Sequence, residues 1–501
     1  MPGNYLPSEG TNDLSSNTSP LALQPSSSDN EQLPETSRSD ELLQSQMKRS
    51  VLARVSAAIE TALILLGLLA IFFLLPREMH GDGTTRYQGL LSLLINHSIP
   101  NIKYSLIGPS FALPLVWLGR HLGDPIAWAL VYNQILFALS LLISYLLLKD
   151  HIDRAILRKF YLLLIIASMF VAHLAFFYGE VFTTLCVGFG ILIAYLRFAA
   201  PAGWLLVAIG VANTPAALGG LALVVLKRIV ENKRLRYGLV FLGALALIGL
   251  NNWLQHGSPL NGGYTDDHGF TTIMPYSGLP GFSYPFFFGI LSLLLSFGKG
   301  LLFFAPGLLL PVRKTLIRLQ QENQVPLYRV YMLWLAFVIG LVLVYARWWA
   351  WYGGTFWGPR FLLFASLPAS LALAVRLLSY KESSLAVNLL TLAVFLLSVW
   401  VCIDGAVYQW STALFTTMPA VCTQNNYNLE MICYYIPEFS TLWLPFVHHY
   451  TLNLQMELFM GYVFLAAAYL VFPLCLHIAR QSGELIRRYS SLYLAVTKWR
   501  I

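Results

Sequence analysis

The run RVSAAIETALILLGLLAIFFLLP at residues 54–76 passes directly into the polar stretch REMHGDGTTRYQ at residues 77–88. An apolar run of about 20 residues is long enough to cross a bilayer as a helix. The polar stretch therefore begins at a membrane surface, and its carboxylate, Asp82, stands between two glycines that let the backbone turn tightly. Which surface this is determines what Asp82 can face.

The composition of the whole chain is that of a membrane protein. Of its 501 residues, 57% are hydrophobic and 11% are charged, which leaves too little polar surface for a soluble protein of this size. The net charge of +8 comes from Lys and Arg in short clusters between apolar runs, as the positive-inside rule expects. We therefore predict an all-α polytopic membrane protein, with membrane lipid and not nucleic acid as its surroundings.

Apolar runs near the length that a bilayer requires recur along the chain. Ten are clear: 54–76, 125–148, 160–178, 181–198, 237–254, 285–312, 329–347, 361–377, 385–403 and 457–477. Two further stretches can each be interpreted in two ways. Residues 105–119 are either a juxtamembrane helix or a span, and residues 203–228, interrupted at Asn213-Thr214-Pro215, are either a hairpin of two short helices or one helix. Both interpretations give about 12 membrane helices.

The positions of the basic residues favour one interpretation. With a juxtamembrane helix at 105–119 and a hairpin at 203–228, 25 Lys and Arg residues are cytoplasmic and 7 are outside, against 21 and 11 for the alternative. Both interpretations place Asp82 outside, and only Glu180 changes sides. We expect a multi-pass protein of the plasma (inner) membrane with cytoplasmic N- and C-termini.

The chain then divides into three regions. Residues 1–50 are rich in polar residues and predict a disordered cytoplasmic tail. Residues 51–477 form the membrane domain, with outer loops at 77–124, 255–284, 348–360 and 404–456, and residues 478–501 form a basic cytoplasmic tail. Polar chemistry is concentrated in the outer loops, and the chain contains no phosphate-binding G-x-x-x-x-G-K-[ST] loop.

Two outer carboxylates are candidates for proton transfer. Asp82 can accept a proton from a hydroxyl nucleophile or hold it in position, but a helix cap or an ion pair with Arg86 would explain the same residue types. Glu180, in Tyr178-Gly179-Glu180, is a second candidate, and it can equally be a residue that favours the start of the next helix.

Basic and aromatic residues suggest an anionic ligand at the outer face. Arg347 and Arg360 bracket a Gly-rich loop, and Arg360 could bind a phosphate through two hydrogen bonds. The tryptophans of this loop are explained equally well as an aromatic belt at the membrane boundary. Lys299 lies within the apolar run 285–312, where a cation either faces a partner such as phosphate or extends to a nearby surface.

Other polar groups carry less specific signals. Asp266-Asp267-His268 could form a metal site but is more typical of a solvated loop, and His448-His449 is typical of a membrane interface. Cys422 and Cys433 share one outer loop and could form a disulfide there, a question that the sequence leaves open.

The order of several short motifs resembles a known group. Stretches like Gly81-Asp82-Gly83-Thr84-Thr85-Arg86-Tyr87, Tyr104-Ser105-Leu106, Gly298-Lys299-Gly300-Leu301 and Trp351-Tyr352-Gly353-Gly354 through Gly358-Pro359-Arg360-Phe361 recur in this order in bacterial relatives of the integral-membrane GT-C glycosyltransferases. That superfamily includes protein O-mannosyltransferases and lipid A aminoarabinose transferases. The resemblance covers residues 54–380, and beyond them only the hydropathy is similar.

The resemblance implies transfer of a hexose or pentose from a polyprenyl-phosphate donor to a hydroxyl of a glycan, lipid or protein acceptor of the cell envelope. Asp82 would orient or deprotonate the acceptor, with Glu180 as a second catalytic carboxylate because Gly83 stands where the best-known members have a Glu. The substrate-binding residues would be Arg86, Tyr87, Lys299, Tyr352 and Arg360. If Arg and Lys neutralise the departing phosphate, the reaction needs no metal or other cofactor. The alternative function is a multi-pass transporter or lipid flippase.

Overall fold

The regular secondary structure of the described residues is helical. The computed structural model describes residues 35–196, 198–264, 267–322, 324–354, 356–410, 429–447 and 450–498, and no strand occurs among them. The chain divides into two compact units, residues 1–56 and 57–501. Helix α1 (Glu35–Leu74) already begins within the predicted disordered tail, and α21 (Leu454–Lys498) continues through most of the predicted C-terminal tail.

Seven helices of the described residues are long and apolar enough to cross a membrane. They occupy Val51–Leu74, Pro125–Leu148, Leu235–His256, Leu327–Tyr345, Arg360–Leu378, Leu385–Trp410 and Leu454–Ser490. Each coincides with one of the ten apolar runs that the sequence marks as clear spans. The structure is therefore helical with seven candidate spans, and the predicted count of about 12 is not confirmed.

The other three apolar runs form short or interrupted helices. Within 160–178 a new helix starts where the Phe170 N–H donates to Ser168 Oγ at 3.1 Å, and within 285–312 the backbone is extended at Gly300. An apolar run therefore indicates burial, but small polar residues and glycines decide whether the helix is continuous. The helices in these runs are α7 (Arg154–Ile166), α8 (Phe170–Leu174), α9 (Gly179–Ile193), α13 (Phe286–Leu295) and α14 (Leu301–Phe304).

Residues 203–228 form a hairpin, as the preferred interpretation predicts. Asn213 Nδ2, at the end of one arm, donates to the Gly179 carbonyl at the start of α9 at 2.9 Å. Arg228, near the end of the other arm, donates to the Tyr195 hydroxyl just beyond the far end of α9 at 2.9 Å. The chain therefore turns back at residues 214–217, and the turn lies at the same end as Glu180. The arms are α10 (Ala200–Asn213) and α11 (Leu218–Asn232).

Residues 105–119 do not form a helix long enough to span a bilayer. They contain α3 (Ile107–Ser110) and the start of α4 (Leu113–Leu122), which have 4 and 10 residues. The remaining helices used below are α2 (Asp82–Ile95), α5 (Pro125–Leu130), α6 (Tyr132–Leu148), α12 (Gly238–His256), α15 (Arg313–Glu322), α16 (Leu327–Tyr345), α17 (Ser366–Leu378), α18 (Leu385–Ala406) and α20 (Glu430–Cys433).

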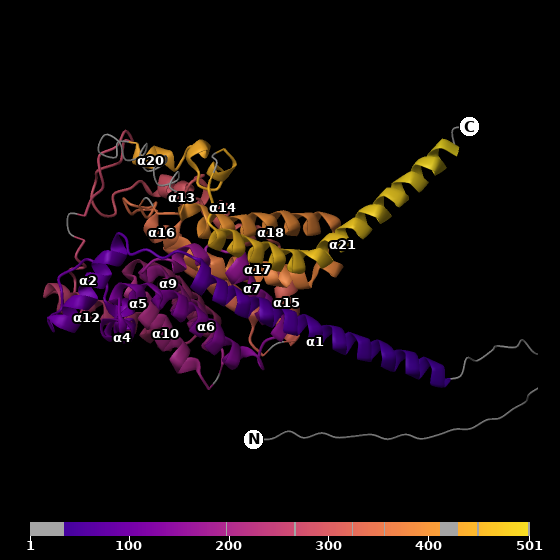
Figure 1. Ribbon diagram of the computed structural model, residues 1–501, viewed down its shortest axis with the longest axis horizontal. Helices are drawn as coiled ribbons and strands as arrows, with labels where there is room; N and C mark the ends of the chain where they lie inside the picture. Colours follow the sequence, from indigo (N-terminus) through magenta and orange to yellow (C-terminus); the bar gives the residue numbers. More distant parts are fainter. Residues whose placement is uncertain are drawn as a thin grey trace, which may run out of the picture. The chain divides into compact units, whose positions relative to one another are not determined.

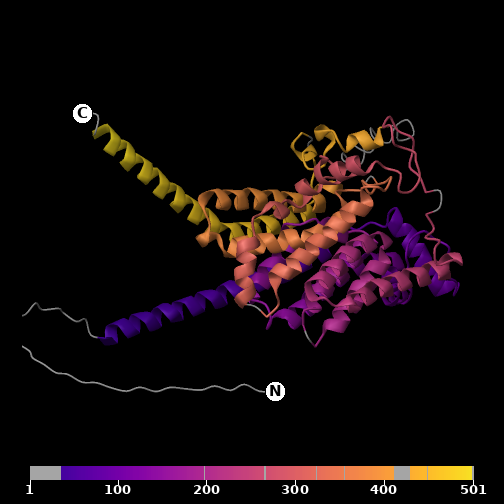
Figure 2. The ribbon, with the colours of Figure 1, turned by 180° about the vertical axis from the view of Figure 1, so that it is seen from behind.

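Helix α17 lies at the centre of residues 57–501. All of its residues except the last are buried, and it packs against α7, α16 and α18, with α18 beside α21 (Figures 1 and 2). Helix α16 is joined to α9 by a hydrogen bond from Trp334 Nε1 to the Gly188 carbonyl at 3.1 Å. This packing aligns the ends of α9, α11, α16 and α17, where the candidate site lies.

Close packing of α9 on α10 is testable at Gly203. A Cβ at this position would lie 2.4 Å from Ala194 N and 2.6 Å from the Gly190 oxygen, which are backbone atoms that cannot move aside cheaply. We expect Gly203→Val to lower the free energy of unfolding by about 1–3 kcal/mol. Thermal unfolding of the purified protein in detergent measures this. Gly243→Val in α12 is the control, because a Cβ there meets no atom within 4 Å; equal melting temperatures for both variants would contradict the prediction.

Candidate functional site

One guanidinium holds two carboxylates at the aligned helix ends. Arg360 begins the 3-10 helix η4 (Arg360–Ala365), and its Nη2 lies 2.8 Å from Asp82 Oδ2 in the first turn of α2. Its Nη1 lies 3.7 Å from Glu180 Oε1 in the first turn of α9. The Tyr104 hydroxyl donates to the other oxygen of Asp82 at 2.7 Å. The structure thus brings together three of the predicted site residues, and it places Glu180 beside Asp82.

Glycines shape the backbone on both sides of this cluster. Gly81, before α2, has a φ of 53°, and a Cβ there would lie 2.7 Å from the ring of Phe356. The loop before Arg360 has φ values of 73°, 79° and 63° at Gly353, Gly354 and Gly358. Such left-handed conformations cost glycine little. The loop can therefore turn tightly and bring Phe356 and Arg360 against the start of α2.

Asp82 is held in its ionised form. Burial raises the pKa of the Asp82 carboxyl, but the charge of Arg360, the hydrogen bond from Tyr104 and the charge of Arg86 together lower it below its ordinary value. Burial and the Asp82 charge raise the pKa of Tyr104, which keeps that phenol a hydrogen-bond donor. Asp82 does not cap α2, because no side chain caps that helix, and its ion pair is with Arg360 and not with Arg86.

Arg86 supplies a second buried cation. Its side chain is 7% exposed, its Nη1 donates to the Ser105 carbonyl at 3.1 Å, and its guanidinium lies 4.9 Å from the centre of the Tyr104 ring. Its Nε has no hydrogen-bond partner. A buried guanidinium with an unused donor is a candidate contact for an anionic ligand.

These charges line a cavity of about 500 Å³, a volume typical of ligand sites. Its charged wall is formed by Asp82, Arg86, Lys103, Glu180, Asp267 and Arg360. Aromatic side chains give the cavity apolar surface as well. They are Tyr264, Phe282, Tyr345, Trp348, Trp349, Phe356 and Phe361. The cavity therefore offers both ionic and apolar contacts to one ligand.

Lys299 holds the glycine-rich loop and is not among the described residues that line the cavity. It is 2% exposed, and its Nζ donates to the carbonyl oxygens of Gly354 and Gly358 at 3.1 Å each and to that of Phe356. An ammonium group has three donors. The structure thus gives Lys299 backbone partners in place of the expected phosphate, and it does not extend to a surface.

Tyr87 and Tyr352, both assigned to substrate binding by the sequence, are also packed outside the cavity lining. Tyr87 is 6% exposed in a core cluster with Leu90 and Phe177. Tyr352 is 3% exposed and stacks on Tyr434, with ring centres 5.0 Å apart.

Lys103, Asp267 and Asn213 also line the cavity, although the sequence did not assign them to catalysis or substrate binding. Lys103 and Asp267 form an ion pair of 2.9 Å that joins the segment between α2 and α3 to the segment between α12 and α13, and Asn213 donates to the Gly179 carbonyl next to Glu180. The turn at Asn213-Thr214-Pro215 is visible in the sequence, but its position next to Glu180 depends on the hairpin. Arg347, in contrast, is exposed and donates to the Phe282 carbonyl at 3.0 Å.

The remaining predicted groups lie partly outside the described residues. Asp266, His448, His449 and Cys422 are not described, and Cys433 is disulfide-bonded. Within the described part of the chain, no group of three or more His, Cys, Asp or Glu side chains could hold a metal ion.

Comparison with known proteins adds no further constraint. No family model, no curated protein and no solved structure matches this chain. A functional assignment therefore depends on the geometry of the site and on the order of the motifs.

The role of Lys299 is testable by Lys299→Met, which keeps the length of the side chain and removes its donors. We expect the free energy of unfolding to fall by about 1–3 kcal/mol, because buried carbonyls lose their hydrogen bonds. Hydrogen exchange at residues 353–361 should become faster. Lys103→Met is the control, because that half-exposed pair should contribute at most about 1 kcal/mol. Unchanged exchange in Lys299→Met would contradict the assignment.

Proposed function

We propose that this chain is an integral-membrane glycosyltransferase of the GT-C type. It moves a hexose or pentose from a polyprenyl-phosphate donor to an acceptor hydroxyl at the extracytoplasmic face. The observation that carries the proposal is the 2.8 Å pair of Asp82 and Arg360 at the cavity, which puts a candidate proton acceptor beside a candidate phosphate ligand. The motif order described above supports the same class of enzyme.

The chemistry requires both charges. The acceptor oxygen forms a bond to the anomeric carbon while the bond from that carbon to the phosphate oxygen breaks. The hydroxyl proton passes to a carboxylate, and the polyprenyl phosphate leaves with the electron pair and one more negative charge. Cations fixed in advance near the departing oxygen stabilise that charge without reorganising. A single displacement of this kind inverts the anomeric configuration.

Arg360 would link donor binding to the basicity of Asp82. While the two are paired, the lowered pKa makes Asp82 a weak base. A donor phosphate would compete for the Arg360 guanidinium, which prefers two parallel hydrogen bonds to such oxygens. Asp82 would then lose part of its ion pair and become a better proton acceptor. Glu180 would keep Arg360 in place during this exchange, because it contacts the other guanidinium nitrogen.

The other groups of the cavity fit the remaining parts of the donor. Arg86 has a free Nε and would share the phosphate charge with Arg360. Rings such as Trp348, Trp349 and Phe361 provide apolar surface for a sugar face or for the first isoprene units. Arg86 and Arg360 can neutralise the phosphate without a metal or other cofactor. The acceptor class and the location at the plasma (inner) membrane belong to the proposal.

Asp82→Asn tests the proposed base. We expect release of polyprenyl phosphate to fall by at least about 100-fold, because the amide cannot take up the proton. The assay offers undecaprenyl-phosphate hexoses and pentoses to proteoliposomes with a cell-envelope fraction and detects undecaprenyl phosphate by mass spectrometry. Asp124→Asn is the control, since Asp124 only caps α5 and Asn caps helices equally well. Near-normal release by folded Asp82→Asn protein would remove Asp82 from the mechanism. A flippase would leave every donor intact.

Arg360→Ala tests the proposed phosphate ligand. We expect kcat/KM for the donor to fall roughly 100-fold, through a higher KM or a lower kcat, because the departing phosphate loses a fixed cation. Arg347→Ala is the control, because Arg347 is exposed and bonded to a backbone carbonyl. An unchanged kcat/KM in Arg360→Ala would show that Arg360 has only a structural role.

A further inference from the structure

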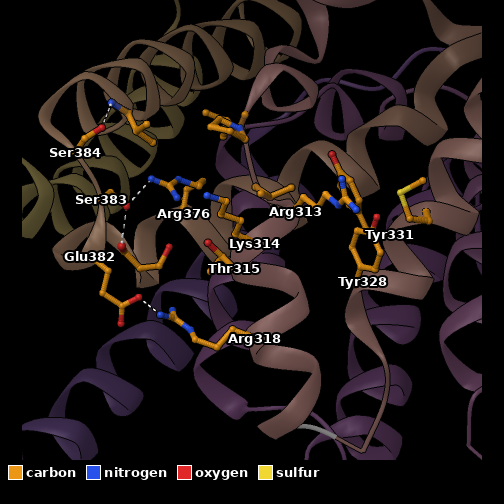
Figure 3. A pocket seen from close by; sticks show the side chains of 16 residues that line it. Arg313, Lys314, Thr315, Arg318, Tyr328, Tyr331, Arg376, Glu382, Ser383 and Ser384 are labelled. Atoms are coloured by element: carbon orange, nitrogen blue, oxygen red, sulfur yellow. Dashed lines mark hydrogen bonds and ion pairs between the residues drawn. The ribbon is translucent and has the colours of Figure 1, made fainter.

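A second cavity lies at the opposite end of the membrane helices from the candidate site. Helix α16 and the span Arg360–Leu378, which consists of η4 and α17, each have one end at the candidate site, at Tyr345 and Arg360. Their other ends are at this cavity, near Tyr328 and Arg376. The 19 residues of α16 span about 28 Å, close to the thickness of a bilayer core. The second cavity is therefore at the other membrane face. It has a volume of about 980 Å³, and Figure 3 shows the side chains that line it.

A buried arginine without a carboxylate partner forms one wall of this cavity. Arg376, in the last turn of α17, is 5% exposed, and its Nη2 donates to the neutral hydroxyl of Ser383 at 2.6 Å. Its Nε has no partner, and no carboxylate of the described residues forms an ion pair with it. The acidic residue nearest along the chain, Glu382, is already paired with Arg318 (Figure 3). A buried cation of this kind lacks a counter-ion.

The start of α15 supplies more positive charge to the same cavity. Arg313 and Lys314 are its first residues and line the cavity together with Thr315 (Figure 3). The N–H groups of a first helical turn have no carbonyl within the helix, and the helix dipole is positive at this end. Two side-chain cations, a helix start and Arg376 thus surround one space.

We propose that this cavity binds a phosphate group at the membrane face opposite the candidate site. The phosphate belongs to the headgroup of an anionic lipid or to a soluble phosphate compound. The positive-inside rule accounts for exposed residues such as Lys314, but it does not account for a guanidinium buried with an unused donor. Apolar and aromatic side chains in the wall, among them Leu310, Met332 and Tyr328, favour the lipid. The site is independent of the proposed transferase function.

Native mass spectrometry of the delipidated full-length protein in detergent tests the site. The probes are dioctanoyl phosphatidylglycerol, dioctanoylglycerol, which has the same chains and no phosphate, and inorganic phosphate. We expect the wild type to prefer phosphatidylglycerol over dioctanoylglycerol. Arg376→Gln should weaken phosphatidylglycerol binding by at least about tenfold, the usual effect of losing a charged hydrogen bond.

Two further variants keep the result interpretable. Lys314→Gln removes an exposed charge that the fold does not need, so it tests the site even if Arg376→Gln fails to fold, and a loss of roughly two- to fivefold is expected. Lys381→Gln removes the same charge from an exposed position outside the cavity and should leave binding unchanged.

Binding of inorganic phosphate with the same sensitivity to these variants would support the site and assign it to a soluble ligand. Equal binding of dioctanoylglycerol, or equal losses in Lys314→Gln and Lys381→Gln, would overturn the proposal.

Discussion

The contact of Arg360 with both Asp82 and Glu180 is the constraint on which the candidate site depends. The three residues are separated by about a hundred residues or more, and each stands in the first turn of its helix. Burying a guanidinium is costly unless carboxylates pair with its charge. The folded membrane domain must therefore bring three helix starts to the same depth, and any packing change that shifts one of them separates the charges.

Small residues and one amide make this alignment possible. Gly203 and Gly190 let α10 approach α9 closely, and Asn213 then reaches the Gly179 carbonyl next to Glu180. The Asn213 oxygen accepts a hydrogen bond from the Gly108 N–H at 2.9 Å, which attaches α3, next to the loop that carries Tyr104, to the same point. Asn213 thus connects the hairpin, α9 and the loop that carries Tyr104.

The sequence predicted the helical class and the charged residues of the site better than it predicted the spans or the partners. Asp82, Glu180 and Arg360 were recognisable because each charge lies close to the end of an apolar run. The interruptions within 160–178 and 285–312 were not predicted, because hydropathy averages over residues such as Ser168 and Gly300. The contacts of Lys299 and the Lys103–Asp267 pair could not be predicted, since both join segments whose proximity is set only by tertiary packing.

The three hydrogen bonds by which Lys299 holds the glycine-rich loop, called the clamp below, affect which substitutions the loop can accept. Lys299 binds main-chain oxygens of the loop, whereas the Phe356 ring lines the cavity. Carbonyl groups are the same in every residue, so replacing Phe356 alters the shape of the binding surface while the clamp keeps its acceptor. Substitutions of Phe356 can therefore change the shape of the cavity while the hydrogen bonds from Lys299 still hold the loop, as long as Gly354 and Gly358 are kept.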